Sequence, residues 1–119
     1  MPNIKRVWRW GLAAGMVAAA LDLSLILAVE PSISVWVLLE AALFWTTAGW
    51  AVVASDTGLS RLAHGVLATV LLNLPWYVLE SFAAGHPEHF PPLLVMSVVF
   101  GLGFGWAKGQ AGGGAAQST

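Results

Sequence analysis

The chain has 119 residues, of which 58% are hydrophobic and only 9% are charged, whereas about 25% of residues in soluble domains are charged. This composition excludes an ordinary water-soluble domain and predicts an integral membrane protein whose principal solvent is lipid. The net charge of −1 argues against a nucleic-acid partner, and the absence of cysteine excludes disulfides, thiolate metal sites and cysteine nucleophiles.

Four apolar segments follow one another along the chain and predict an all-α, four-transmembrane-helix bundle built of two hairpins. They cover approximately residues 10–29, 33–53, 62–82 and 91–106. At the helical rise per residue the first three are about 30 Å long, which matches the hydrocarbon core of a bilayer. The fourth reaches only about 24 Å. We therefore expect it to need local thinning of the bilayer or snorkelling by Lys108.

Turn and cap residues separate these segments. Glu30-Pro31-Ser32 lies between the first two, residues 55–58 lie between the second and third, and Pro91-Pro92 opens the fourth. We expect the first segment to remain a transmembrane helix and not a cleaved signal peptide, because small residues are poorly placed for cleavage after Leu27. Residues 1–109 are expected to form one transmembrane domain, and the Gly/Ala-rich residues 110–119 a flexible tail.

The basic residues set the expected orientation. All five flank the same ends of the segments: Lys5, Arg6, Arg9, Arg61 and Lys108. The positive-inside rule therefore places both termini and the loop around Asp56 in the cytoplasm, and the loops around Glu30 and residues 80–92 outside. The expected location is the bacterial inner (cytoplasmic) membrane.

Two acids fall well inside the predicted helices. Asp22 and Glu40 are each seven residues from the outer end of their segment, which places both about 10 Å below the outer boundary and allows them to face each other. An acid near mid-membrane costs about 2.5–3.5 kcal/mol on insertion scales, so it usually has a specific role. Asn73 lies at a similar depth on the third segment, where Pro75 removes a hydrogen bond to the Leu71 carbonyl.

Helical spacing groups these polar residues with small ones. The predicted faces are Gly11, Gly15, Ala18 and Asp22; Glu40 and Thr47; Thr69, Asn73, Tyr77 and Glu80; and Ser97, Gly101 and Gly105. Because small residues let helix backbones approach closely in lipid, we expect these faces to form the helix–helix contacts. They would enclose a polar pocket open to the outer side. Its predicted members are Asp22, Glu40, Asn73, Tyr77 and Glu80.

No lysine or arginine lies at the depth of this predicted pocket. Carboxylates close together in a low dielectric are therefore expected to share a proton or to bind a cation. This favours a transporter-like protein that handles protons or cations, working as a homo-oligomer because four helices enclose little space. The alternative is a non-catalytic accessory or assembly subunit of a larger membrane complex, in which protonated acids act as hydrogen-bonding contacts between helices.

The outer loop carries a second group of polar residues, His86, Glu88 and His89. Imidazole and carboxylate groups bind Zn²⁺ or Cu²⁺, although this spacing matches no established metal motif. A metal-binding protein is therefore a further alternative, and solvated surface is the competing interpretation of the loop.

The remaining polar and aromatic residues give weaker indications. His64 is expected at the inner interface beside Arg61, and Trp45 is expected to pack in the core or against lipid. The sequence contains no phosphate loop, serine-nucleophile elbow or His-Glu-x-x-His motif, so an enzyme is less favoured and no cofactor is predicted. A lipid or quinone near Trp76 and Tyr77 stays open as a hydrophobic ligand.

Overall fold

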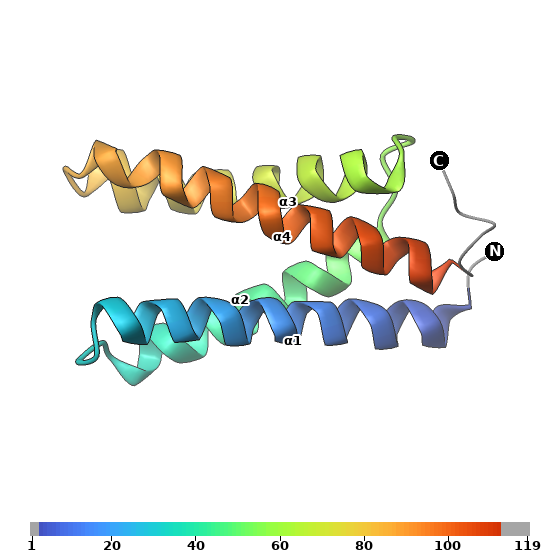
Figure 1. Cartoon of the computed structure of the whole chain (residues 1–119), viewed down its shortest axis with the longest axis horizontal. Coiled ribbons are helices and arrows are strands. Elements are labelled where there is room, and N and C mark those ends of the chain that lie inside the picture. The colour runs from blue at the N-terminus through green and yellow to red at the C-terminus, as the bar shows by residue number, and fades with distance from the viewer. Residues whose placement is uncertain (1–2, 113–119) are drawn as a thin grey trace.

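The computed structural model describes residues 3–112, which are helical almost throughout (Figure 1). The elements are α1 (Ile4–Val29), α2 (Val35–Ala54), α3 (Arg61–Val78), the π-helical turn η1 (Leu79–Ala83), the 3₁₀ turn η2 (Pro87–His89) and α4 (Phe90–Ala111). The described range contains no strand. Four helical stretches are long and apolar enough to cross a membrane. The all-helical class and the four membrane-length helices are thus confirmed.

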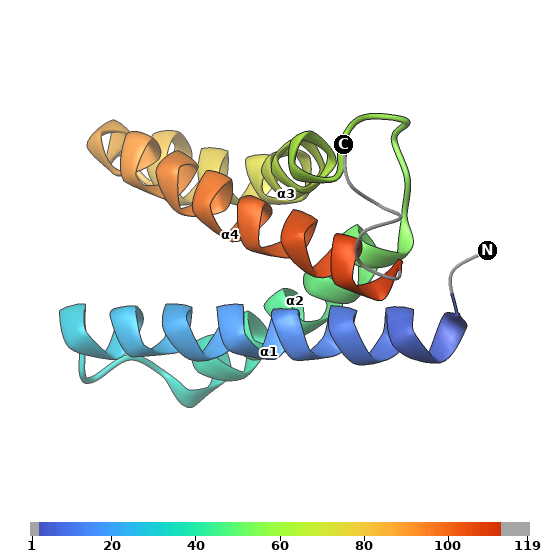
Figure 2. The ribbon, with the colours of Figure 1, turned by 45° about the vertical axis from the view of Figure 1, so that its right-hand side comes forward.

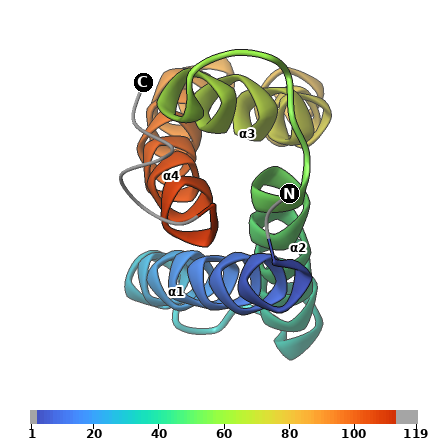
Figure 3. The same ribbon diagram turned by 90° about the vertical axis from the view of Figure 1, so that its right-hand side faces the viewer.

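The helices form two hairpins, α1 with α2 and α3 with α4. We call the end that carries residues 30–34 and 84–89 the hairpin end, and the opposite end, with residues 55–60 and the end of α4, the terminal end. The two hairpins lie close together at the terminal end and diverge toward the hairpin end (Figures 1 and 2). Viewed from the terminal end, α4 lies between α3 and α1 (Figure 3).

Each of the first two helices is preceded by a residue whose side chain caps its N-terminus. The Asn3 side chain accepts a hydrogen bond from the Lys5 backbone N–H at 2.8 Å, so α1 begins at Ile4, earlier than the predicted residue 10. Ser34 accepts a bond from the Trp36 N–H at 3.2 Å, and α2 therefore begins at Val35.

The fourth helix is longer than predicted. It has 22 residues, which corresponds to about 33 Å, so the expectation of a short helix was wrong. The polar Lys108 and Gln110 suggested an earlier end, but Ala107 and Ala111 are buried in a cluster with Val53 and keep the last turns packed. Residues 110 and 111 of the predicted tail are helical, and residues 113–119 lie outside the described part of the chain.

The third helix changes its hydrogen bonding near the hairpin end. Pro75 has no N–H to donate, and four residues later the Leu79 N–H reaches the carbonyls of both Pro75 and Trp76. The chain then continues as the π turn to Ala83 and leaves the helix through Gly85, whose φ of +81° lies in the left-handed region. This local geometry sets the direction of the loop that follows.

Glycine makes the closest contacts within each hairpin. A Cβ on Gly15 would lie 2.6 Å from the Thr46 carbonyl oxygen, and a Cβ on Gly101 would lie 2.7 Å from the Gly65 carbonyl oxygen. Only glycine permits such backbone proximity. The small-residue faces predicted for the first and fourth helices are therefore confirmed as contact faces.

The predicted contact face of α2 was wrong. Glu40 and Thr47 are exposed. The buried face consists of Ala41, Trp45, Ala48, Gly49, Val52 and Val53. Because α2 is apolar on nearly all sides, its few polar residues gave no reliable orientation, and the close approach allowed by alanine and glycine decided the packing.

The core lies where α1, α2 and α4 meet. The Trp45 ring packs edge-on against Phe100, with centroids 4.8 Å apart, and also lies beside Phe104. Many large apolar side chains on the outer helix surfaces are exposed, among them Val17, Leu43, Leu71 and Val95. An exposed apolar surface of this extent is suited to lipid chains and not to water.

Candidate functional site

A cleft of about 1020 Å³ opens between the two hairpins toward the hairpin end. Its volume is at the upper end of the about 300–1000 Å³ usual for ligand pockets. All five residues predicted for the polar pocket line this cleft: Asp22, Glu40, Asn73, Tyr77 and Glu80. The structure therefore brings them together, while their role in binding stays a prediction.

Asp22 lies at the point where the cleft meets the aromatic core. Its carboxylate accepts a hydrogen bond of 2.8 Å from the Trp45 indole N–H. Sequence reasoning had Asp22 facing Glu40 and treated Trp45 as packing alone. A buried indole N–H requires an acceptor and an intramembrane carboxylate requires a donor, so the sequence could have predicted a hydrogen bond between Trp45 and Asp22.

Two further carboxylates lie nearer the mouth of the cleft. Glu40 projects from α2, and Glu80 from the π turn that follows α3. The Glu80 carboxylate interacts electrostatically with both Glu40 and Asp22. Within residues 3–112, no lysine or arginine lines the cleft, and His89 is the basic residue of its lining. The carboxylates therefore share one lining without a lysine or arginine partner.

Two polar residues of α3 form part of the same wall. Asn73 is 2% exposed, and its side-chain amide donates to the Thr69 carbonyl at 2.9 Å instead of to an acid. Tyr77 is 3% exposed, and its buried hydroxyl makes no hydrogen bond of standard geometry within residues 3–112. It lies close enough to Ser97 to interact with that hydroxyl, which donates to the Leu94 carbonyl at 2.9 Å. The Tyr77 oxygen is therefore enclosed by protein atoms.

Aromatic and aliphatic side chains complete the lining. Phe44, Trp76 and Phe100 contribute rings, and aliphatic residues of α1 and α4 fill much of the remaining wall. Ring faces attract cations, most strongly where water is excluded. Carboxylates beside aromatic rings therefore suit a positively charged occupant.

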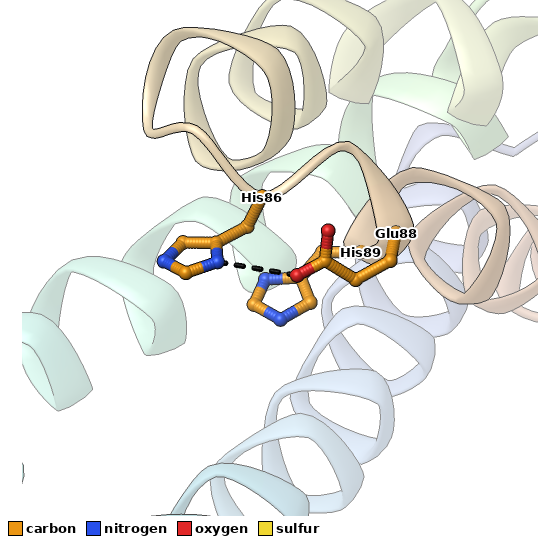
Figure 4. A group of neighbouring side chains, drawn as sticks. All are labelled: His86, Glu88 and His89. Carbon is orange, nitrogen blue, oxygen red and sulfur yellow. Dashed lines mark hydrogen bonds and ion pairs between the residues drawn. The ribbon is translucent and has the colours of Figure 1, made fainter.

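The hairpin-end loop brings together His86, Glu88 and His89 (Figure 4). Nδ1 of His86 lies 3.2 Å from Oε1 of Glu88, and the two imidazole rings stack with centroids 5.0 Å apart at 17°. All three residues are exposed, and His89 also lines the cleft. The sequence singled out these residues as ligands, and metal binding stays a prediction.

His64, at the terminal end, is completely buried instead of interfacial. Its Nε2 lies 2.7 Å from the Val52 carbonyl oxygen and its Nδ1 lies 3.1 Å from the Thr57 hydroxyl. A carbonyl can only accept, so Nε2–H donates to Val52 and, in the neutral ring, Nδ1 accepts from Thr57. Val52 lies in the last turn of α2, where carbonyls lack helical donors. His64 therefore caps α2 from α3.

Two charged residues complete the terminal end. Lys108 donates to the carbonyls of Val53 and Ser55, which adds a cation at the C-terminus of α2. The Gly58 backbone N–H donates to Asp56 at 2.9 Å, and this bond, supported by the charge of Lys108, holds the pKa of the Asp56 carboxyl below its usual range.

Comparison with protein-family models, with characterised proteins and with solved structures found no match for this chain. The functional inference therefore rests on the chemistry of the cleft and of the hairpin-end loop.

Proposed function

We propose that this is a small transporter-like membrane protein that binds protons or cations in the cleft between its hairpins. The observation that carries the proposal is that Asp22, Glu40 and Glu80 line one cleft whose lining, in the described part of the chain, includes no lysine or arginine. Carboxylates in a low dielectric need a proton or a cation to balance them.

The proposed orientation places the hairpin end outside. All five basic residues lie in the first turns of α1, the first turn of α3 or the last turns of α4, which are all at the terminal end. The positive-inside rule then favours cytoplasmic termini, with the bacterial inner membrane as the proposed location. In this orientation the cleft opens outward.

The depth of the acids suggests an order of binding. Glu80 lies in the π turn that follows α3, Glu40 lies about 7.5 Å along α2 from its start, and Asp22 lies about 10 Å along α1 from its end. A cation would meet Glu80 and Glu40 first and then Asp22. The ring cluster of Trp45, Phe100 and Phe104 closes the path beyond Asp22. Passage to the cytoplasm would require the two hairpins to move relative to each other and to separate at the terminal end.

A homo-oligomer is part of the proposal. Glu40 and Thr47 also line a shallow groove of about 500 Å³ on the exposed face of α2. An acid that faces lipid is costly, and a second copy of the chain packed on this face would reduce the cost.

Flux measurements in proteoliposomes test the proposal. Asp22→Asn is expected to reduce proton or cation flux by about tenfold or more without loss of folding, and Glu40→Gln and Glu80→Gln are expected to reduce it less. Asp56→Asn, an acid at the opposite end, is the matched control. Wild-type flux in a protein with all three cleft acids neutralised would refute the proposal.

The groove on α2 equally supports an accessory subunit that packs against a different protein. Native mass spectrometry from the original membrane in mild detergent separates the two. A mass that is a multiple of this chain favours the homo-oligomer, and a stoichiometric second protein favours the accessory subunit. A bound lipid or quinone would appear in the same spectrum.

A further inference from the structure

We propose that His86, Glu88 and His89 form a binding site for a divalent transition-metal ion, with Zn²⁺ as the best match, at the mouth of the cleft. The proposal goes beyond cation binding by the cleft acids, because the loop can hold a metal whether or not the cleft carries one. It rests on the backbone, the donor geometry and the ligand chemistry of this loop.

The backbone holds the three residues in one place. The His86 N–H donates to the Ser81 carbonyl at 2.7 Å and ties the loop to the π turn, and the His89 N–H donates to the His86 carbonyl at 3.0 Å. His86 immediately precedes the 3₁₀ turn Pro87–His89, so the turn brings His89 back beside it, and the two imidazole rings stack. Main-chain hydrogen bonds thus hold the backbone of the three residues together.

The donor atoms lie close enough to share one ion. One ligand atom from each residue lies within 4.8 Å of the other two, and the closest pair, His86 Nδ1 and Glu88 Oε1, is 3.2 Å apart. Ligands bound at about 2.1 Å in a tetrahedral site lie roughly 3.4 Å from one another. Small side-chain rotations of exposed residues would therefore complete the geometry.

The ligand types select the class of metal. Two imidazole nitrogens and one carboxylate oxygen suit Zn²⁺, Ni²⁺ or Cu²⁺, whereas Ca²⁺ and Mg²⁺ prefer oxygen ligands throughout. The side chains of His86 and Glu88 are 58% and 65% exposed. The fourth ligand would therefore be water, as in zinc sites with three protein ligands and one open position.

A plain ion pair is the competing explanation. It would involve only His86 and Glu88, and an exposed pair of this kind contributes little to stability because water screens its charges. It leaves out His89, although a ligand atom of His89 lies within 4.8 Å of one from each of the other two residues. A shared metal would use all three, after rotation of the stacked rings turns both nitrogens toward the ion.

Zinc titration of the full-length, chelator-treated protein in lipid nanodiscs tests the site. Calorimetry should give one Zn²⁺ per chain, and His86→Ala, His89→Ala and Glu88→Gln should each weaken binding by about tenfold or more. Mg²⁺ in excess should not compete. Asp56→Asn is the control, and because the three loop side chains are exposed, the variants should keep wild-type helical content by circular dichroism.

The outcomes separate this proposal from the proposed function. Equal zinc affinity in the wild type and in a His86→Ala, His89→Ala double variant overturns the loop site. Loss of zinc binding only in an Asp22→Asn, Glu40→Gln variant also overturns it, while it supports the cleft as the cation site. Zinc binding that depends on the loop, in a protein without flux, overturns the proposed function and supports the loop site.

Discussion

The two ends of the molecule differ in how tightly the helices pack. At the terminal end, His64 and Lys108 donate hydrogen bonds to the last carbonyls of α2, and an apolar cluster of Val53, Ala107 and Ala111 holds the helices together. At the hairpin end the same helices diverge around a cleft of about 1020 Å³. Both ends contain polar side chains at the edge of an apolar interior. At the terminal end His64 and Lys108 bond main-chain carbonyls, and the Trp50 indole N–H is the buried donor there without a partner among the described residues. At the hairpin end Glu40 and Glu80 line the cleft with no lysine or arginine beside them among the described residues, and Asp22 is bonded only by the Trp45 side chain.

This difference distinguishes structural polar groups from binding groups. A polar group that satisfies a free helix carbonyl stabilises the fold and has no capacity left for a ligand. An unpaired carboxylate or hydroxyl in a cleft retains its capacity, at a cost to stability. Trp45 takes part in both the core and the cleft, because its ring packs in the core and its N–H donates to Asp22 in the cleft.

The largest expected effect on stability comes from disrupting the close packing between α3 and α4. Gly101→Leu places a side chain against the backbone of Gly65 and Val66. We expect a loss of about 3 kcal/mol in stability, because neither backbone can yield without separating α3 from α4. Thermal unfolding followed by tryptophan fluorescence measures the change.

Gly103→Leu on the same helix is the matched control, since nothing lies within 4 Å of a Cβ at that position. It should unfold at or slightly above the wild-type temperature, because leucine favours a helix more than glycine does. Equal destabilisation by the two substitutions would contradict the assignment of Gly101 to the contact.

The second prediction compares the two ends directly. His64→Ala leaves the Val52 carbonyl and the Thr57 hydroxyl without their partner and should cost about 2 kcal/mol. His86→Ala removes an exposed histidine at the other end and should change stability by less than about 0.5 kcal/mol. Metal-free protein in denaturant titrations checks both values. A similar loss for both variants would remove the distinction between the ends.

The third prediction concerns the boundary between core and cleft. Trp45→Phe keeps an aromatic ring in the core but removes the donor to Asp22, and we expect a loss of about 1 kcal/mol. A double-mutant cycle with Asp22→Leu, which removes the acceptor, separates the hydrogen bond from the change in packing. Additive effects of the two substitutions would show that the bond contributes nothing.

The sequence predicted the helices and much of the cleft because both follow from simple periodicities. Length and hydropathy identified four membrane-length helices, and spacing on α3 correctly grouped Asn73 with Tyr77. Depth along α1 and α2 placed Asp22 and Glu40 near the same level, and both line the cleft.

Other features depend on contacts that no single helix encodes. The orientation of α2 is set by how Ala41, Ala48 and Gly49 fit against neighbouring helices. The position of Glu40 therefore predicted the wrong contact face. His64 is buried because residues 52–57 fold over it. The divergence of the hairpins follows from side-chain volumes summed over four helices, which the pattern of each segment alone does not contain.

The smallest expected effect is a pH dependence confined to the terminal end. The Asp56 pKa is lowered in the folded protein, first by the Gly58 N–H and then by Lys108. The folded state thus favours the charged carboxylate, and the resulting stabilisation is present above the unfolded pKa of about 3.9 and is lost as the pH falls through the folded pKa.

Asp56→Asn keeps an oxygen that can accept from Gly58 and removes only the charge. The wild type should therefore melt slightly higher than the variant above about pH 5, and the difference should shrink toward zero at lower pH. High salt should reduce the difference, because it screens the exposed charge of Asp56 from Lys108. A difference that grows as the pH falls would mean that this carboxylate is destabilised in the folded state and that the terminal end, too, contains an uncompensated acid.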